Sequence, residues 1–433
     1  MSERDATQRA ALQRPATNDR EAWKTFWKAQ GQPWRTEPEI DIERQKYLAE
    51  KRSITPNIEQ GIYPFKDIKL SRADVEWLLS KHEETTWQTG TNLTIRSGLD
   101  LRGAYLRGID LQRLPLAGLL AGLEPEVWYK ATEEQREEAA IHLEGANLTL
   151  ADLSQTQLKS AHLEGANLSK AHLEFASLRG AHLGGKTLPE TSTEQHLENE
   201  HHTLRLPPAN LQYTTFNVGS TLEETDLGNE QDGYVRLVDV RWGGVNLAAV
   251  NWTQVRMLGN EQEAHQDKTS DGEKDKTTRL KEYEIAVRAN RQLAIVLQEQ
   301  GLNEQAARFA YRAQKLQRVV LRRQRKFGQY FFSLFLDILA GYGYRPARSV
   351  FWYLVIIVGF ALAYHVLGQL SLFPPDAFIY SLTSFHGRGF FPGLEHRTSL
   401  HDPLVMLAAF EAVVGLLIEI SFIATFTQRF LGK

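Results

Sequence analysis

The sequence predicts a multidomain α+β protein in which a soluble repeat region precedes an all-α membrane domain. Three observations support this prediction: leucine recurs at every fifth position through the middle of the chain, two long apolar segments stand near its C-terminal end, and the remainder is strongly polar. At 433 residues the chain exceeds the size of most single hydrophobic cores, so several structural units are expected. The mean hydropathy of −0.38 therefore averages a polar region and an apolar C-terminal region.

Charge and cysteine content exclude several functions. The formal net charge of −3 argues against nucleic acid as a partner, because binding phosphate requires concentrated Lys and Arg. The absence of cysteine excludes disulfides, thiolate metal ligands and cysteine nucleophiles. No nucleophile–base arrangement, phosphate-binding loop or zinc-protease motif appears, so we expect neither an enzyme nor a cofactor. The charged start of the chain lacks the apolar core of a signal peptide, which predicts a cytoplasmic N-terminus.

Residues 1–96 are expected to form an N-terminal module of mixed helical content. Seven aromatic residues stand between positions 20 and 82, enough for a small core. Ser71 is a candidate N-cap for a helix that runs to His82, since a serine side chain can accept a hydrogen bond from the first helical turn.

Leucine occupies every fifth position from Leu143 to Leu188, ten times in succession. A small residue, usually alanine, stands two positions before most of these leucines, and the other positions are polar. A period of five fits neither an α-helix nor a β-strand. Shorter runs of the same pattern flank this block, so the predicted repeat region spans 97–257, with insertions at 120–140 and 190–206.

The five-residue unit A-(N/D/H)-L-x-x resembles the unit of pentapeptide-repeat proteins. The resemblance implies a right-handed quadrilateral β-helix, in which leucine and the small residue point inward. Some members of that family mimic DNA, which requires a strongly acidic surface. Residues 143–188 instead mix acidic and basic side chains, so DNA mimicry is not expected here.

One column of the predicted coil carries histidine. If four five-residue sides make one turn, positions 20 apart stack at about the 4.8 Å spacing of neighbouring strands. His142, His162 and His182 then form a ladder that is a weak candidate for a metal site. The alternative is that histidine takes an outward position that Asn or Asp occupies in other units, without any metal.

Residues 258–279 are polar and are predicted to be a flexible linker. The following segment, 280–326, has helical periodicity and resembles one tetratricopeptide-type helical hairpin, with Gly301 at its turn. Basic residues end this hairpin and precede the apolar sequence: Arg318, Arg322, Arg323, Arg325, Lys326, Arg345 and Arg348. They form either a solvated helix face or a patch at a membrane surface, and the neighbouring apolar sequence favours the membrane.

Two segments are long and apolar enough to cross a membrane. Residues 349–368 contain no Asp, Glu, Lys or Arg, and about twenty helical residues cross a hydrocarbon core of roughly 30 Å. The second segment, 403–427, carries Glu411 and Glu419 with Gly415 between them on one stripe. An ionised side chain facing lipid at a helix centre costs roughly 2.5–3.5 kcal/mol, so the stripe is expected to be an inner, intersubunit or pore-lining face.

Charge asymmetry predicts the orientation of these spans. Basic residues flank both spans on the side of the chain ends, whereas the connector holds few, so both termini are expected in the cytoplasm of a multi-pass cell-membrane protein. Residues 327–348 are apolar and aromatic but short. An interfacial helix is favoured for this segment, with a third span as the alternative.

The connector predicts a re-entrant loop over residues 376–393, because an apolar stretch too short to span the membrane precedes a glycine-rich return. Together with the two spans, 349–433 resembles the two-transmembrane pore-loop channels of the potassium-channel superfamily. The resemblance implies a gating hinge at Gly415. It also implies a filter at Ser384, Phe385, His386, Gly387, Arg388, Gly389 and Phe390.

The filter departs from the family pattern Thr-Val-Gly-Tyr-Gly-Asp, because Arg388 replaces the Tyr and Phe390 the Asp. A ring of Arg388 side chains either favours anions or pairs with Glu395, Asp402 or Glu411 and braces the loop. We therefore expect a homotetrameric ion channel of unidentified permeant ion, whose cytoplasmic repeat region binds a protein partner. The alternative is a non-conducting membrane-anchored scaffold for protein interactions.

Overall fold

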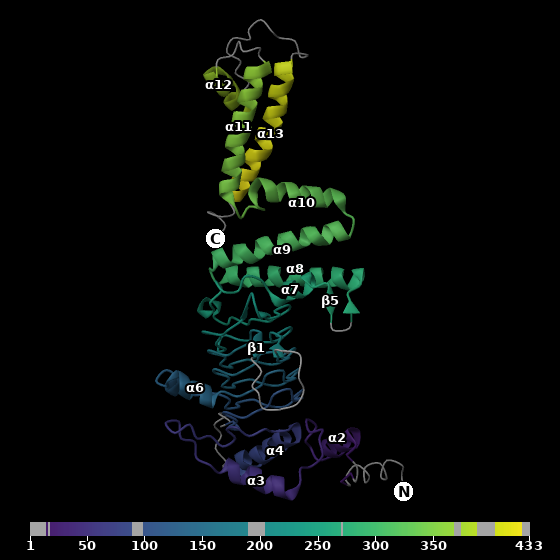
Figure 1. Cartoon of the computed structure of the whole chain (residues 1–433), viewed down its shortest axis with the longest axis vertical. Coiled ribbons are helices and arrows are strands. Elements are labelled where there is room, and N and C mark those ends of the chain that lie inside the picture. Colours follow the sequence, from purple (N-terminus) through teal and green to yellow (C-terminus); the bar gives the residue numbers. More distant parts are fainter. Residues whose placement is uncertain are drawn as a thin grey trace, which may run out of the picture. The chain divides into compact units, whose positions relative to one another are not determined.

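The computed structural model describes residues 14–15, 18–88, 98–188, 204–269, 272–367, 374–387 and 403–426. The chain divides into two compact units, Met1–Ala306 and Ala307–Lys433. Figure 1 traces the order of helices and strands along each unit. The first unit contains an N-terminal helical module and the repeats, and the second contains the apolar helices.

The N-terminal module consists of helices α2 (Arg20–Ala29), α3 (Ile42–Arg52) and α4 (Arg72–Gln88). The Ser71 hydroxyl accepts a hydrogen bond from the Asp74 amide at 3.2 Å, which confirms the expected N-cap. The helix continues beyond the predicted end at His82, and residues 89–97 lie outside the described part.

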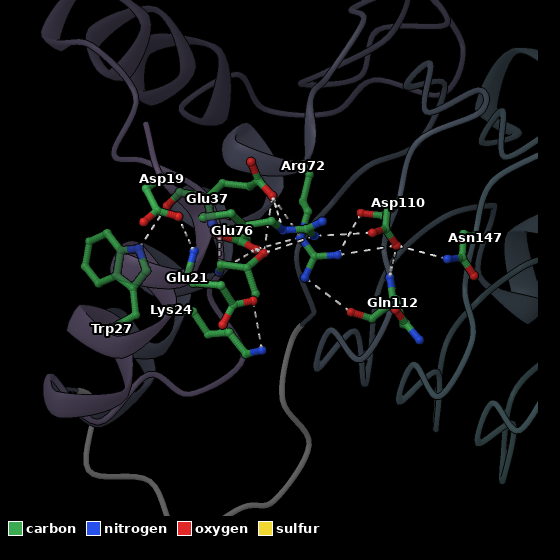
Figure 2. A network of polar contacts seen from close by, with 12 residues as sticks. Asp19, Glu21, Lys24, Trp27, Glu37, Arg72, Glu76, Asp110, Gln112 and Asn147 are labelled. Carbon is green, nitrogen blue, oxygen red and sulfur yellow. Dashed lines mark hydrogen bonds and ion pairs between the residues drawn. The ribbon is translucent and has the colours of Figure 1, made fainter. Parts of the chain in front are cut away.

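Arg72 joins this module to the first coils of the repeat region (Figure 2). Its guanidinium donates to the backbone carbonyls of Asp110 at 2.9 Å and Gln112 at 3.2 Å, and to the Glu76 carboxylate at 2.8 Å. A parallel bridge from Lys69 to Tyr105 continues the same contact through the backbone. The module therefore covers the first edge of the repeat ladder, which would otherwise expose unpaired strand groups.

The repeats form a ladder of parallel bridges between positions 20 apart, such as Asn147 with Asn167 and Gln157 with Ser177. This confirms the stacking expected from the five-residue period. Left-handed backbone conformations recur at every fifth position of the same block, at Gly145, Leu150, Gln155, Ser160, Gly165, Lys170, Phe175 and Gly180. A turn of this kind after every five residues brings each leucine inward, and Leu143–Leu183 at the repeating positions are at most 1% exposed.

The ladder continues across both predicted insertions, because Tyr105 pairs with His142 and His182 pairs with Asp226. The first insertion contains α5 (Pro125–Trp128) and α6 (Glu133–Ala139). Around the second, β1 (Lys186–Leu188) pairs antiparallel with β2 (Leu204–Leu206), and residues 189–203 lie outside the described part. Later elements of the repeat region are the β3 (Gly228–Asn229) and β4 (Gly233–Tyr234) pair and the 3-10 helix η1 (Leu247–Ala249).

The described residues of this range, 258–269 and 272–279, are not the flexible linker that their polarity suggested. They form helix α7 (Gly259–His265) and the paired strands β5 (Lys268–Thr269) and β6 (Gly272–Glu273). The Asn260 side chain, 1% exposed, accepts a hydrogen bond from the Leu237 amide at 2.9 Å. A polar segment is ordered here because its side chains satisfy backbone groups at the last edge of the ladder.

Helix α8 (Lys276–Glu299) also covers the last edge of the repeat ladder. Its Gln292 and Gln300 side chains accept from the amides of Asp239 at 3.0 Å and Leu247 at 2.8 Å. After α8, Gly301 has a φ of 76° and turns the chain toward α9 (Asn303–Arg323), as expected for the turn of a helical hairpin.

The second unit contains α10 (Phe327–Ala340), α11 (Pro346–Leu367), α12 (Pro374–Phe385) and α13 (Pro403–Phe426). Both α11 and α13 contain 21-residue segments of mean hydropathy 2.2, which are long and apolar enough to cross a membrane. Helix α10 has 14 residues, about 21 Å, and is too short to cross a hydrocarbon core. Its exposed apolar residues are Phe327, Phe331, Phe332, Phe335 and Ile338, and its interfacial placement stays a prediction.

Deleting one inward leucine is expected to destabilise the ladder. Leu163 is fully buried, so Leu163→Ala leaves a cavity and should lower the free energy of unfolding by about 2–5 kcal/mol. Thermal and denaturant unfolding of the detergent-solubilised chain, followed by circular dichroism, measures this. Leu150→Ala, at an exposed turn position, is the control and should shift unfolding by only about 0.5 kcal/mol.

Candidate functional site

Glu411 on α13 lies in the interior of the second unit and is fully buried. Its two carboxyl oxygens accept hydrogen bonds from the Tyr364 hydroxyl of α11 at 2.6 Å and the Ser381 hydroxyl of α12 at 2.5 Å. Glu411 therefore ties α13 to both neighbouring helices. Of the inner, intersubunit and pore-lining faces expected for this stripe, the Glu411 side chain lies on the inner one, and a pore-lining role of Glu419 stays a prediction.

Gly415, one turn further along α13, meets the last residue of α12. A Cβ at this position would lie 2.1 Å from the Phe385 carbonyl oxygen, well inside van der Waals contact. The Phe385 ring belongs to a buried cluster with Leu339, Ile357 and Ile418. Close approach at Gly415 was expected from the sequence, and the neighbour is the end of the short helix. A hinge function of Gly415 stays a prediction.

The residues expected to form a filter divide into two groups. Ser384 and Phe385 are 3% and 1% exposed in the last turn of α12, so their side chains pack within the chain, and their place in the filter stays a prediction. His386 and Gly387 follow the helix, and Gly387 has a φ of 67°. Arg388, Gly389, Phe390, Glu395 and Asp402 lie outside the described residues.

His386 and Glu419 face each other beside a cavity of about 300 Å³. His386 Nδ1 contacts the Glu419 carboxylate, and its Nε2 lies 3.2 Å from the Tyr353 hydroxyl. The cavity wall also includes Ala412, Val413 and Leu416 of α13. This open, partly polar pocket at the end of α12 is where the predicted filter segment begins.

Asp337 is the centre of a second polar cluster, which the sequence indicated only as an acidic break in α10. Its carboxylate accepts from the Arg318 guanidinium at 2.7 Å and the Tyr311 hydroxyl at 2.9 Å. Arg348 of α11 lies 3.6 Å from the same carboxylate and donates to the Asp337 carbonyl at 3.1 Å. The cluster joins α9, α10 and α11.

The expected membrane-surface basic residues are therefore separated by the fold. Arg318 is largely buried against Asp337, which corrects its assignment to a surface patch, and Arg348 is half-buried. Arg345 is exposed and lies 4.8 Å from the Tyr311 ring. The exposed basic side chains at the end of α9 are Arg322, Arg323, Arg325 and Lys326.

Removing the Asp337 carboxylate should loosen this cluster. Asp337→Ala leaves the largely buried Arg318 without its partner, so we expect a loss of roughly 3 kcal/mol in the free energy of unfolding. Thermal unfolding and limited proteolysis of the full chain in detergent measure this, with Asp376→Ala, exposed at the start of α12, as the control. Equal effects of both changes would contradict a structural role for Asp337.

The cluster also predicts an acid dependence. Burial raises the pKa of Asp337, but hydrogen bonds from Arg318 and Tyr311 outweigh this and hold the pKa below its ordinary value. A depressed carboxyl pKa contributes stability above the unfolded-state value of about 3.9, and this is lost as pH falls through the folded-state pKa.

The histidine column of the repeat region is present, with ring centroids of His142 and His162 4.7 Å apart and those of His162 and His182 5.1 Å apart. His162 is only 3% exposed, although it pairs in register with His142 and His182. Glu137 of α6 covers it, with its carboxylate 2.8 Å from His162 Nε2. The first insertion thus shields the middle histidine of the column from solvent.

Carboxylates flank this column. Burial lowers the pKa of His162, but Glu137 and Glu164 outweigh it and raise the pKa to about 9. Burial raises the pKa of Glu144, while His142 and Arg107 lower it to about 2. Sequence reasoning missed these acids, although Glu144 and Glu164 each stand two residues after a histidine, as in His162-Leu163-Glu164.

A family model for five-residue repeats matches the central part of the ladder. Residues 143–185 match the family model for pentapeptide repeats in eight copies, and no curated protein sequence matches the chain. A pentapeptide repeat protein from the Arabidopsis thaliana thylakoid lumen matches at 17% identity over 36% of this chain and 77% of its own, with a TM-score of 0.18.

Two further solved structures are similar over about a third of the chain. HetL, a pentapeptide repeat protein involved in heterocyst differentiation regulation from the cyanobacterium Nostoc sp. strain PCC 7120, matches at 19% identity over 35% of this chain and 56% of its own, with a TM-score of 0.09. QnrB1, a plasmid-mediated fluoroquinolone resistance protein, matches at 14% identity over 34% and 76%, with a TM-score of 0.11. The chain is a protein that contains pentapeptide repeats together with two helices long and apolar enough to span a membrane.

Proposed function

We propose that this chain is the subunit of an oligomeric ion channel with a cytoplasmic repeat domain. One observation carries the proposal: the 12-residue helix α12 is about 18 Å long, too short to cross a hydrocarbon core, yet it packs against both long apolar helices. Glu411 and Gly415 hold it there through Ser381 and Phe385. A short helix between two spans is the arrangement of a re-entrant pore loop.

The oligomer follows from the same geometry. One pair of spans cannot enclose a pore, so several copies must associate, and we propose a homotetramer because pore-loop channels close fourfold. Apolar side chains exposed on α13, including Phe410, Val413 and Leu417, are available to lipid and to neighbouring subunits. The basic flanks of the spans favour a cell-membrane protein with both termini in the cytoplasm.

The cytoplasmic region acts as a regulatory domain in this proposal. We propose that the repeats close into a right-handed quadrilateral β-helix whose surface binds a protein partner. Within the second unit, the Asp337 cluster joins α9 to α10 and α11. A partner that shifts α9 would therefore pull on the first span through Arg318, Asp337 and Arg348.

The filter residue Arg388 gives the direct test of conduction. In planar bilayers under a KCl gradient, the purified chain is expected to carry current, and Arg388→Ala should shift the reversal potential toward cation selectivity, because a ring of arginine side chains repels cations. Arg397→Ala, in the same connector, is the control. Silence at all voltages from intact oligomers would contradict the channel.

A non-conducting scaffold is the second candidate. It is favoured by the fact that both oxygens of Glu411 find partners within one chain, so the spans need no pore water to satisfy this acid. In that case the helices anchor and oligomerise the repeat domain. Neither the unchanged chain nor Arg388→Ala then carries current in planar bilayers.

A further inference from the structure

Three potential metal ligands converge on the repeat ladder beneath α6. The three ligand atoms lie within 4.8 Å of one another, one from each of Glu144, His162 and Glu164. The three residues are 6%, 3% and 2% exposed. Two carboxylates and an imidazole are therefore held together almost entirely out of water, in a part of the molecule that the proposed channel does not use.

Each of these residues keeps one polar atom without a hydrogen-bond partner: Glu144 Oε2, His162 Nδ1 and Glu164 Oε2. Leaving a buried polar atom unpaired costs about 1–3 kcal/mol, so three at one place indicate a missing partner. The other carboxylate oxygens are engaged, because Glu144 Oε1 lies 2.8 Å from Arg107 and Glu164 Oε1 lies 3.5 Å from Lys186.

The imidazole is oriented as a metal ligand is. Glu137 lies 2.8 Å from His162 Nε2, which leaves Nδ1 on the side of Glu164, 3.6 Å from that carboxylate. Histidine ligands in metal sites commonly donate their other ring N–H to a carboxylate, which fixes the ring and raises its basicity. Stacking against His142 and His182 restrains the same ring from both faces.

We propose that Glu144, Glu164 and His162 Nδ1 bind one divalent transition-metal ion, with Zn²⁺ the best match and Glu137 as the orienting residue. Zn²⁺ accepts mixed nitrogen and oxygen ligands at about 2.0–2.2 Å, and a water completes four-coordination. Ligand atoms around such an ion lie roughly 3.4 Å apart, so the side chains need to close by about 1 Å. Two carboxylates balance the charge of the ion.

Such an ion would have a structural effect rather than a catalytic one. Glu144 and Glu164 belong to successive coils, and Glu137 belongs to α6 of the insertion, so the ion and its orienting carboxylate link two coils and the insertion. Arg107 and Lys186 lie at the rim with half-exposed side chains and can turn outward when the ion enters. Binding would stabilise the ladder because the ion binds only the folded arrangement.

The test uses the full chain in detergent after treatment with EDTA and dialysis. Isothermal titration with Zn²⁺ is expected to show one site that His162→Gln and Glu164→Gln each weaken at least tenfold. Co²⁺ should give the visible absorption of a four-coordinate ion in the unchanged chain and not in these variants. Zn²⁺ should also raise the midpoint of thermal unfolding of the unchanged chain alone.

A neighbouring column supplies a matched control. His172 and Glu174 repeat the same His-Leu-Glu spacing but are more exposed, with the His172 side chain at 55%. His172→Gln is expected to leave the Zn²⁺ site unchanged. The proposal is overturned if the folded chain binds neither Zn²⁺ nor Co²⁺, or if His162→Gln and His172→Gln alter binding equally. Circular dichroism establishes folding of each variant, and Glu144→Gln replaces any that fails.

Discussion

Gly415→Val is expected to abolish the packing of α12 against α13 and, with it, any ion current. The new Cβ would stand 2.1 Å from the Phe385 carbonyl oxygen and 3.0 Å from its carbon. Backbone atoms cannot turn aside as a flexible side chain can, so the whole end of α12 must move. Because Phe385 belongs to the predicted filter segment, moving the end of α12 is expected to displace that segment.

The measurement combines bilayer recording with limited proteolysis in detergent, which reports exposure of the segment around α12. Gly359→Val is the matched control, because a Cβ at Gly359 of α11 meets nothing within 4 Å. The same residue type in a neighbouring apolar helix therefore receives the same change without a clash. Loss of current from both variants would contradict a specific role for Gly415 and indicate a general sensitivity to valine.

Glu411→Ala is expected to have the second large effect, a chain that no longer assembles its membrane helices. The change removes the carboxylate that accepts from the buried Tyr364 hydroxyl, at a cost of about 1–3 kcal/mol. Ser381 loses the same acceptor and keeps only the Ile357 carbonyl at 2.9 Å. The change also opens a cavity where the side chain stood. Size-exclusion chromatography and proteolysis in detergent should show loss of the oligomer and exposure of α12.

Glu411→Gln separates charge from hydrogen bonding. The amide keeps one acceptor oxygen for either hydroxyl, so this variant is expected to retain the oligomer with reduced thermal stability. If Glu411→Ala assembled and conducted as the unchanged chain does, the bonds from Tyr364 and Ser381 would contribute nothing to the placement of α12. If only conduction failed in Glu411→Gln, the carboxylate charge itself would be required.

Local patterns predicted the repeats and the apolar helices well. The resemblance carried by the leucine period implied which side chains point inward and that residues 20 apart would pair, as His142 and His162 do. It did not predict that His162 would be buried, because its cover comes from Glu137 in an insertion of different character. Polarity alone also misassigned the segment after the repeats, where helix α7 contacts the last coil through Asn260.

The residues of the candidate membrane site were predicted from the sequence, but their hydrogen-bond partners were not. Sequence spacing placed Glu411, Gly415 and Glu419 on one stripe, and the structure shows that Glu411 faces the interior of its own chain. Asp337 was expected only to interrupt a helix, yet it accepts hydrogen bonds from Arg318 and Tyr311. Spacing determines the face of a helix on which a residue lies, whereas its partner depends on which helix packs there.

The sequence by itself therefore determined the five-residue period and two helices long enough to span a membrane, and the family resemblance carried by that period implied the ladder and its inward leucines. These follow from periodicity and length, which are local and repeat many times along the chain. Only the tertiary structure decided which polar side chains meet: Glu411 with α11 and α12, Asp337 with α9 and α11, and His162 with acids from other coils and from α6. A buried polar group needs a specific partner at about 3 Å, and the fold brings that partner from a distant part of the chain.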